Sequence, residues 1–331
     1  MKKLLERLFT GDTLSREEAR DLLTRITSKE FNDIQVASLM TVYRMRPITV
    51  EELLGYRESL IDAAVPVDLS SFEATDIVGT GGDGKNTFNI STCACFVVAG
   101  AGYKVIKHGN HAASSVSGAS TVLQNHGVKF TTDSSVHSRS LEGSGVAYLH
   151  AQLFHPALAS VGPIRRAIGM QTIFNLLGPL VNPAAPSFQL LGVADLSQMR
   201  LYVATLQALG MGFSVINSLD GYDEISLTDD FKVASGNFEH VYTPEEIGFP
   251  RATQGSLYGG ATAMEASAIF DSVLEGTSTP EQKNAVVVNS AFAIRNFNPE
   301  KPISECIAQA RESLDSGKAL ASFKKFLEIN G

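Results

Sequence analysis

Apolar residues in the first 65 positions recur every three or four residues, which is the spacing of amphipathic helices. Two segments begin with the S/T-x-x-E pattern of a capping box, in which each side chain accepts a hydrogen bond from the other residue's backbone N–H group. They are Ser15 with Glu18 and Thr49 with Glu52, and apolar residues at helical spacing follow both pairs. The pattern predicts an all-helical domain over residues 1–65.

A different pattern follows residue 65. The segment 65–75 contains proline and serine and has no periodicity, as expected for a boundary between domains. Beyond it, short apolar runs alternate with helical stretches, which implies a mainly parallel sheet with helices on both faces. The runs predict strands over residues 76–78, 104–106, 146–149, 189–193 and 213–216. We therefore expect a larger α/β domain over 75–331, and a helical segment near 165–183 that joins the small helical domain.

The last third of the chain continues the sheet and then becomes helical. Residues 231–235 and 238–242, joined by a Gly-Asn pair, predict a hairpin. Three helices are expected after it, of which Thr279 and a following proline open the middle one. The last helix is predicted to run from Ile303 to Ile329.

Length and charge narrow the class of protein. A chain of 331 residues exceeds the roughly 250 to 300 at which a single core stops growing, which agrees with two domains. Lys and Arg total 27 against 35 Asp and Glu, so the net charge of -8 predicts no general attraction to nucleic acid or anionic lipid. The uncharged stretch 86–103 is polar in its first half, so no membrane span is expected.

The cysteines and the N-terminus indicate the compartment. The three cysteines, Cys93, Cys95 and Cys306, form no C-x-x-C pair and suit a reducing environment. Glu6 and Arg7 interrupt the N-terminal apolar residues before a signal peptide can develop. We therefore expect a cytoplasmic protein that binds neither nucleic acid nor membrane.

A glycine-rich turn over residues 79–87, Gly-Thr-Gly-Gly-Asp-Gly-Lys-Asn-Thr, lies between a predicted strand and a predicted helix, where backbone amides can hold an anion. Its G-x-G-x-x-G pattern matches dinucleotide-binding turns, but no Asp or Glu occurs from residue 84 to 132 to bind a ribose hydroxyl. It also matches G-x-x-x-x-G-K, but Asn86 stands where a P-loop has Ser or Thr. A tight surface turn without a ligand is the remaining alternative.

The acid-free stretch of 49 residues contains four lysines although the protein is acidic: Lys85, Lys104, Lys107 and Lys129. Its hydroxyl and amide side chains gather at two strand ends, over residues 89–92 and 107–118. Because ligands of open α/β sheets bind outside the carboxyl ends of the strands, both loops are expected to face one crevice. The stretch therefore predicts a polyphosphate site, and His108 is the histidine that we expect near a substrate.

Five motifs of the chain, in this order, resemble the anthranilate phosphoribosyltransferase family. They are Gly-Thr-Gly-Gly-Asp at 79–83, Asn-Ile-Ser-Thr at 89–92, Lys-His-Gly-Asn at 107–110 with Ser114 and Ser115, Arg165 before Phe-Asn-Leu-Leu-Gly-Pro-Leu at 174–180, and Asp-Glu-Ile-Ser at 223–226. The resemblance runs from about residue 75 to about residue 228, and the helical ends also fit.

The resemblance implies a fold of the nucleoside phosphorylase/phosphoribosyltransferase type, a homodimer and Mg²⁺ as cofactor. The implied reaction transfers the phosphoribosyl group from phosphoribosyl pyrophosphate (PRPP) to the amine of anthranilate in tryptophan biosynthesis. The products are N-(5-phosphoribosyl)anthranilate and pyrophosphate. Because an arylamine is already neutral at pH 7, this reaction needs no covalent nucleophile, and none is evident in the chain.

The resemblance also implies site residues, carried over one by one onto matching positions. The PRPP positions are Gly79, Gly82, Asp83, Thr87, Asn89, Ile90, Ser91, Thr92, Lys107 and Ser115. The anthranilate positions are Gly79, Asn110 and Arg165, and the magnesium positions are Ser91, Asp223 and Glu224. The family often has Arg, Lys, Ser and Arg where this chain has His111, Val116, Ala119 and Gln171, so His111 and Ala119 are not counted among the site residues.

Two other functions share this architecture. Pyrimidine nucleoside phosphorylases also handle a ribose anomeric centre, but they are longer, and the acidic pair at 223 and 224 has no use there without a metal. A nucleic-acid-binding relative that has lost catalysis would need a basic surface, which a net charge of -8 does not predict.

Overall fold

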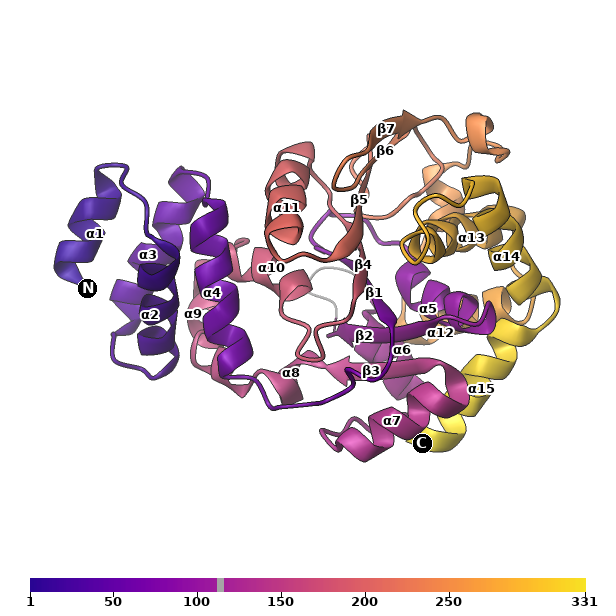
Figure 1. Cartoon of the computed structure of the whole chain (residues 1–331), viewed down its shortest axis with the longest axis horizontal. Coiled ribbons are helices and arrows are strands. Elements are labelled where there is room, and N and C mark those ends of the chain that lie inside the picture. The colour runs from indigo at the N-terminus through magenta and orange to yellow at the C-terminus, as the bar shows by residue number, and fades with distance from the viewer. Residues whose placement is uncertain (112–115) are drawn as a thin grey trace. The chain divides into compact units, whose positions relative to one another are not determined.

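The computed structural model describes residues 1–111 and 116–331, which form two compact units (Figure 1). The first unit consists of Met1–Pro66 and Ala151–Pro183, and the second of Val67–His150 and Ala184–Gly331. Each unit is therefore built from two separate pieces of chain. Ser114 and Ser115 lie outside the described residues.

The first unit is built of helices. Ser15 and Thr49 cap two of them in the predicted capping boxes, and Asn32 with Gln35 forms a third box. The α-helices are α1 Lys2–Phe9, α2 Arg16–Thr27, α3 Asp33–Met45, α4 Val50–Asp62, α8 Ala151–Phe154, α9 Gly162–Ile168 and α10 Ile173–Leu177. Two 3-10 helices, η1 Pro156–Ser160 and η2 Gly178–Leu180, complete the unit.

The two pieces of the first unit are joined by hydrogen bonds to backbone carbonyls. The N–H group of Val65 donates to the carbonyl of Phe154 at 2.8 Å. Arg57 Nε donates to the carbonyl of Leu180 at 2.8 Å. Because Arg57 is largely buried, burial lowers the pKa of its guanidinium. The later piece of chain therefore completes the bonding of the N-terminal helices.

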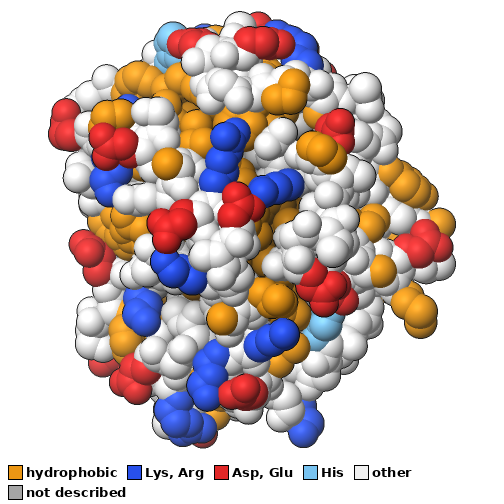
Figure 2. All heavy atoms as spheres, turned by 90° about the vertical axis from the view of Figure 1, so that its right-hand side faces the viewer, with side chains coloured by type: hydrophobic (Ala, Val, Ile, Leu, Met, Phe, Trp, Pro, Cys, Tyr) orange, Lys and Arg blue, Asp and Glu red, His pale blue; other side chains and the backbone are white. Residues whose placement is uncertain are grey.

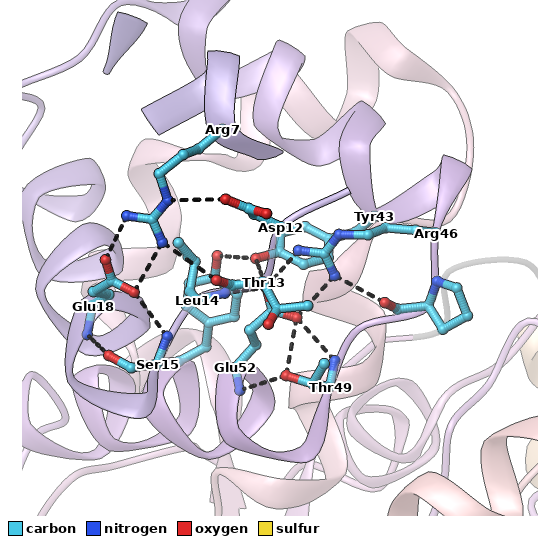
Figure 3. A network of polar contacts seen from close by, with 12 residues as sticks. Arg7, Asp12, Thr13, Leu14, Ser15, Glu18, Tyr43, Arg46, Thr49 and Glu52 are labelled. Carbon is cyan, nitrogen blue, oxygen red and sulfur yellow. Dashed lines mark hydrogen bonds and ion pairs between the residues drawn. The ribbon is translucent and has the colours of Figure 1, made fainter. Parts of the chain in front are cut away.

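A buried carboxylate organises the N-terminal helices (Figure 3). Glu52, with no exposed surface, accepts hydrogen bonds from the N–H groups of Leu14 at 3.0 Å and Thr49 at 2.9 Å. Arg46 Nη1 donates to it at 2.9 Å and the hydroxyl of Tyr43 at 3.2 Å. Burial by itself would raise the pKa of Glu52, but the hydrogen bonds from Arg46, Thr49 and Leu14 outweigh burial and lower it.

The second unit contains a seven-stranded sheet in the order β3-β2-β1-β4-β5-β6-β7. The strands are β1 Ala74–Gly79, β2 Lys104–Gly109, β3 Val146–His150, β4 Phe188–Gly192, β5 Gly212–Ser218, β6 Phe231–Ala234 and β7 Glu239–Tyr242. The first five are parallel to their neighbours, and β6 and β7 pair antiparallel as the predicted hairpin. The predicted fold class, a helical domain with a mainly parallel α/β domain, is confirmed.

Helices cover both faces of this sheet. Helix α5, Ile90–Gly100, is buried on every side from Cys93 to Val98, and it packs against the sheet, α13 and α15. A helix that is apolar all round must lie inside a core. Figure 1 shows α5 and α13 on one side of the sheet and α11 on the other. The remaining helices of this unit include α6 Ala119–Asn125, α7 Ser134–Ser144, α11 Leu196–Ala208 and the 3-10 helices η3 Glu245–Ile247 and η4 Gln254–Leu257.

The C-terminal region differs from the prediction of three helices. Four α-helices follow the hairpin, namely α12 Ala263–Leu274, α13 Pro280–Arg295, α14 Ile303–Asp315 and α15 Lys318–Asn330. The single helix predicted over 303–329 is wrong, because Gly317 adopts a φ of 76° and breaks it in two. This left-handed conformation suits glycine and ends a helix.

No helix among the described residues has the length and the apolar composition needed to cross a membrane. Figure 2 shows the face made by the C-terminal helices, on which basic and acidic side chains are interspersed. On this face, positive charge does not form the continuous patch that a nucleic-acid backbone attracts.

Replacing Glu52 by Gln is expected to destabilise the protein by about 3 kcal/mol, because it leaves the half-buried Arg46 without its ion-pair partner. The folded-state pKa of Glu52 is lowered, so its stabilisation is complete above the pKa of the unfolded carboxyl and is lost as pH falls through the lowered value. The difference in the free energy of unfolding between wild type and Glu52→Gln should therefore become smaller at acidic pH. Urea unfolding at several pH values measures it.

Asp62→Asn is the matched control for this experiment. Asp62 ends the same helix and pairs with Arg20, but both side chains are about half exposed. Surface pairs contribute at most about 1 kcal/mol, so this change should have little effect at any pH. An equal loss of stability in both variants would contradict the role given to Glu52.

Candidate active site

The turn that carries Asp223 lies directly on the ends of two neighbouring strands. Gly79 ends β1 and Gly192 ends β4, and the two residues are paired in the register of the sheet. A Cβ atom at Gly192 would overlap the carbonyl oxygen of Asp223, and one at Gly79 would overlap its carboxylate. The absence of side chains at these two positions therefore makes room for the acidic turn.

Backbone amides hold both acidic side chains of this turn. The N–H group of Gly81 donates to Asp223 Oδ2 at 2.6 Å. The N–H group of Ser91, in the first turn of α5, donates to Glu224 Oε1 at 3.0 Å, where the positive end of the helix dipole favours an anion. Among the described residues, Glu224 Oε2 has no hydrogen-bond partner although it is buried. One carboxylate oxygen is thus available to a ligand.

The surroundings of this pair disfavour negative charge. Burial, followed by the charge of Asp83, raises the pKa of Asp223. Burial and the charge of Asp223 likewise raise the pKa of Glu224, which the hydrogen bond from the Ser91 N–H group and the charge of Lys107 only partly offset. The carboxylates of Asp83, Asp223 and Glu224 therefore lie close enough together to repel one another. A cation at this place would relieve their repulsion.

Lys107 lies deeper than a surface phosphate-binding lysine. It is 3 % exposed, its Nζ donates to the carbonyl of Ile77, and Ser91 Oγ lies 3.4 Å from it. The structure therefore brings Lys107 together with Ser91 and within range of the charge of Glu224. Its charge acts on this site from inside the protein.

The acidic pair fits a magnesium ion that is shared with a substrate. The described residues contain no group of three or more His, Cys, Asp and Glu side chains arranged to hold a metal by themselves. Mg²⁺ usually binds one or two carboxylates and completes its shell with waters and substrate phosphates. The free Oε2 of Glu224, beside Asp223 and Ser91, meets that requirement only in part, so the remaining oxygens must come from a ligand.

The glycine-rich turn has the conformation that its composition predicts. Gly81, Gly82 and Gly84 have φ values of 66°, 74° and 72°, a region that residues with a Cβ atom rarely adopt. Asp83 Oδ1 accepts a hydrogen bond from the N–H group of Lys85 at 3.0 Å, which closes the turn. Gly81 and Gly82 are exposed at its tip.

The residues after the turn lead into α5. Thr87 forms an isolated bridge with Tyr258. Asn89 does not cap the helix with its side chain; its Nδ2 donates to the carbonyl of Ser117 at 3.0 Å, and its buried Oδ1 has no partner among the described residues. Ile90 and Thr92 are buried.

Asn86 is a residue whose role the sequence did not indicate. Its Nδ2 donates to the carbonyl of Gly260 at 2.8 Å, and its Oδ1 accepts from the N–H group of Val116 at 3.3 Å. Its own carbonyl accepts from the N–H group of Gly259 at 2.7 Å. Asn86 therefore ties the glycine-rich turn to two distant loops, and no local pattern could have shown this.

The end of β2 carries the second group of predicted residues. His108, expected near a substrate, is 5 % exposed, and its N–H group donates to Asp76 Oδ1 at 3.4 Å. Asn110 is exposed, and its carbonyl accepts from the N–H group of Ser120 at 3.2 Å. Of these two predicted contacts, Asn110 is the one open to a ligand.

Arg165 belongs to the first unit, on α9. Its Nη2 donates to Asn175 Oδ1 at 3.4 Å, and its guanidinium lies 5.7 Å from the centre of the Phe174 ring. Burial lowers its pKa, and no carboxylate among the described residues forms an ion pair with it. A half-buried guanidinium without a counter-ion is suited to bind an anionic ligand.

Comparisons with known proteins agree with this geometry. Residues 71–320 match the family described as "Glycosyl transferase family, a/b domain", and residues 2–64 match its helical bundle domain. An anthranilate phosphoribosyltransferase of Phocaeicola vulgatus is 59% identical over 330 residues, covering 100% of both chains. The chain belongs to the anthranilate phosphoribosyltransferase family. The resemblance seen in its motifs is thereby confirmed.

Solved structures of anthranilate phosphoribosyltransferases share the fold. The enzyme of Thermus thermophilus superimposes with a TM-score of 0.92 at 32% identity, covering 98% of each chain. The Saccharomyces cerevisiae enzyme in complex with PRPP and Mg has a TM-score of 0.91 at 27% identity, covering 98% of this chain and 96% of the yeast chain.

Replacing Gly192 by Ala is expected to displace the acidic turn, because the added Cβ meets the backbone carbonyl of Asp223 and not a flexible side chain. Crowding of this kind costs about 1 to 3 kcal/mol. Denaturant unfolding measures the loss. Gly255→Ala is the control, since a Cβ there has no heavy atom within 4 Å. Equal stability of the two variants would show that the turn does not depend on Gly192.

Proposed function

We propose that this chain transfers the phosphoribosyl group of PRPP to the amine of anthranilate, forming N-(5-phosphoribosyl)anthranilate and pyrophosphate in tryptophan biosynthesis. The observation that carries the proposal is the acidic pair Asp223 and Glu224, held by amides of the glycine-rich turn and of α5. In a protein 59% identical to an anthranilate phosphoribosyltransferase, such a site suits a pyrophosphate bound with a cation.

The chemistry requires stabilisation of negative charge. When pyrophosphate leaves the anomeric carbon, charge builds on its oxygens, and fixed donors that face this charge lower the barrier. The glycine-rich turn at Gly82, the hydroxyls of Ser91 and Thr92 and the buried charge of Lys107 are the groups that we assign to this role. Gly79, Asp83, Thr87, Asn89, Ile90 and Ser115 are assigned to the same PRPP site.

We assign Mg²⁺ to Asp223, Glu224 and Ser91. Three carboxylates facing a site for a polyanion would repel it, so a cation is needed to reverse the sign of the interaction. When bound, Mg²⁺ neutralises charge on the phosphate oxygens. The yeast relative was solved in complex with PRPP and Mg, which supports this assignment.

We assign anthranilate to Asn110, Arg165 and Gly79. Asn110 offers an exposed amide, and Arg165 is a planar cation without an ion-pair partner among the described residues. A guanidinium matches the two oxygens of a carboxylate. The neutral arylamine attacks without prior deprotonation, so no catalytic nucleophile is assigned.

We further propose a homodimer and a cytoplasmic location, as the family resemblance implies. Cys93, Cys95 and Cys306 are all free and buried, which suits a reducing compartment. Light scattering on the purified protein tests the dimer.

The reaction itself is tested with the purified protein, Mg²⁺, PRPP and anthranilate, by following the loss of anthranilate fluorescence. Uridine or thymidine with phosphate is the parallel assay for the nucleoside phosphorylase alternative. Turnover of the nucleoside and none of anthranilate would overturn the proposed function.

Arg165→Ala is expected to raise the anthranilate KM far more than the PRPP KM. The loss in the free energy of anthranilate binding should be about 1.5 to 3 kcal/mol, the scale for a hydrogen bond to a charged group. Steady-state kinetics with each substrate varied in turn measures it. Arg166→Ala is the control, because Arg166 is exposed and adjacent on the same helix. Equal effects on both substrates would mean that Arg165 only supports the fold.

Asp223→Asn combined with Glu224→Gln is expected to abolish turnover at ordinary Mg²⁺ concentrations. The change removes the negative charge of the pair, so binding of PRPP without Mg²⁺ should not weaken, and the gain in affinity that Mg²⁺ gives should disappear. Calorimetry of PRPP binding with and without Mg²⁺ measures both effects.

The matched control for this double variant removes two carboxylates from the same loop. Asp229 and Asp230 are both paired with Arg251 and not with the glycine-rich turn. Asp229→Asn with Asp230→Asn should keep turnover and metal dependence. If the 223/224 variant behaves in the same way as this control, the magnesium assignment is wrong.

A further inference from the structure

A buried hydrogen-bonded cluster lies behind the turn that follows β2. Ser120, in α6, places its Oγ 2.6 Å from the hydroxyl of Tyr148 and 2.8 Å from His150 Nδ1. The three side chains are 0 %, 5 % and 6 % exposed, respectively. Tyr148 and His150 come from β3, so the cluster binds a helix to a strand. None of these residues takes part in the chemistry proposed above.

The same serine is bound to an exposed pair of residues. Its backbone N–H group donates to the carbonyl of Asn110 at 3.2 Å. Asn110 Oδ1 accepts from the N–H group of His111 at 2.8 Å. Both Asn110 and His111 are exposed. Ser120 therefore connects buried donors and acceptors to two side chains that a ligand can reach.

Further contacts limit where this turn can lie. Gly109 stands opposite His150 in the register of β2 and β3, and a Cβ at Gly109 would lie 2.5 Å from the hydroxyl of Tyr148. The rings of His111 and His150 meet edge to face, with centroids 5.3 Å apart. His111 Nδ1 lies 3.2 Å from Thr121 Oγ1. The turn is thus held through its main chain and through the His111 ring.

One arrangement of protons satisfies the cluster. With an unprotonated Nδ1 on His150, Tyr148 donates to Ser120 Oγ and Ser120 donates to that nitrogen. Burial, and then the neighbouring His111, lower the pKa of His150, which favours its neutral form. Burial raises the pKa of Tyr148, which keeps its hydroxyl a donor.

We propose that Ser120 and His150 are positioning residues that set the affinity for anthranilate, by fixing Asn110 and His111 from behind. The proposal rests on the proposed function, since it takes Asn110 as an anthranilate contact. A rigid neighbour that is itself hydrogen-bonded holds a binding side chain in place better than a mobile loop does. Loosening the cluster should therefore weaken the binding of anthranilate and leave the binding of PRPP unchanged.

The chain offers a matched control for a change at Ser120. Ser140 is equally buried, its Oγ donates to the carbonyl of Val146 at 2.6 Å, and it accepts from Asn330 Nδ2 at 3.0 Å. Val146 begins β3, whereas His150 ends it. Ser140→Ala therefore removes a buried hydroxyl with two partners at the opposite end of the same strand.

The test compares Ser120→Ala with Ser140→Ala in steady-state kinetics. Ser120→Ala should raise the anthranilate KM roughly fivefold, the net effect of one lost hydrogen bond, and leave the PRPP KM and kcat within about twofold. Ser140→Ala should leave both KM values unchanged. Equal shifts in the two KM values for Ser120→Ala, or the same shift in both variants, would falsify the positioning role.

Two changes at His150 keep the test decisive if Ser120→Ala does not fold. His150→Asn retains an oxygen acceptor at the position of Nδ1 and should preserve the anthranilate KM. His150→Leu has no acceptor and should raise it as Ser120→Ala does. Loss of affinity in both His150 variants to the same degree would mean that only the volume of the ring matters.

A measurement without substrate separates this proposal from the proposed function. In protein with ¹⁵N-labelled histidine, Nδ1 of His150 should show the shift of an unprotonated acceptor, and Ser120→Ala should change it. A protonated Nδ1 would overturn the cluster as described, whatever the enzyme transfers. If His150 Nδ1 behaves as described but the wild type does not use anthranilate, the proposed function is wrong. The role of the cluster in anthranilate binding is then wrong as well.

Discussion

The candidate site depends on one steric constraint, the close approach of the acidic turn to the ends of β1 and β4. Gly79 and Gly192 are paired across these strands, so two positions without Cβ atoms lie side by side. The carbonyl and carboxylate of Asp223 occupy the space that side chains would fill. Once Asp223 is there, the amide of Gly81 is its partner, and the next residue, Glu224, reaches the first turn of α5.

This packing gathers like charges that the protein alone does not neutralise. Amides orient the carboxylates of Asp223 and Glu224, but burial and repulsion by neighbouring carboxylates raise both pKa values, and the charge of Lys107 offsets only part of this at Glu224. The free energy cost of burying these carboxylates would be relieved by the Mg²⁺ and phosphate that we propose for this site. On this proposal, the site would favour metal and substrate together over either one alone.

Local patterns predicted much of the fold. The capping boxes at Ser15 and Thr49 start helices as expected, and the short apolar runs form the five parallel strands. The end of the chain was predicted less well. Apolar periodicity continues across Gly317, and the helix is broken there only because this residue adopts a left-handed conformation.

The site was predicted through its motifs, whereas its physical contacts were not. The contact of Gly192 with Asp223 and that of Asn86 with Gly260 join residues that no local window contains. A lysine at the end of a strand is expected at the surface, and only the packing of α5 on the sheet shows that Lys107 is enclosed. In the sequence, Asn86 argued against a P-loop motif. In the structure, its hydrogen bonds connect the glycine-rich turn to two distant loops.

The interrupted layout of the first unit affects how the chain matures during synthesis. Val65 and Arg57 find their partners in Phe154 and Leu180, which lie beyond the first three strands of the sheet. A nascent chain emerges N-terminus first, so its opening helices leave the ribosome long before these carbonyl groups do. Completion of the smaller unit is therefore a late event, although its helices are the first to be made.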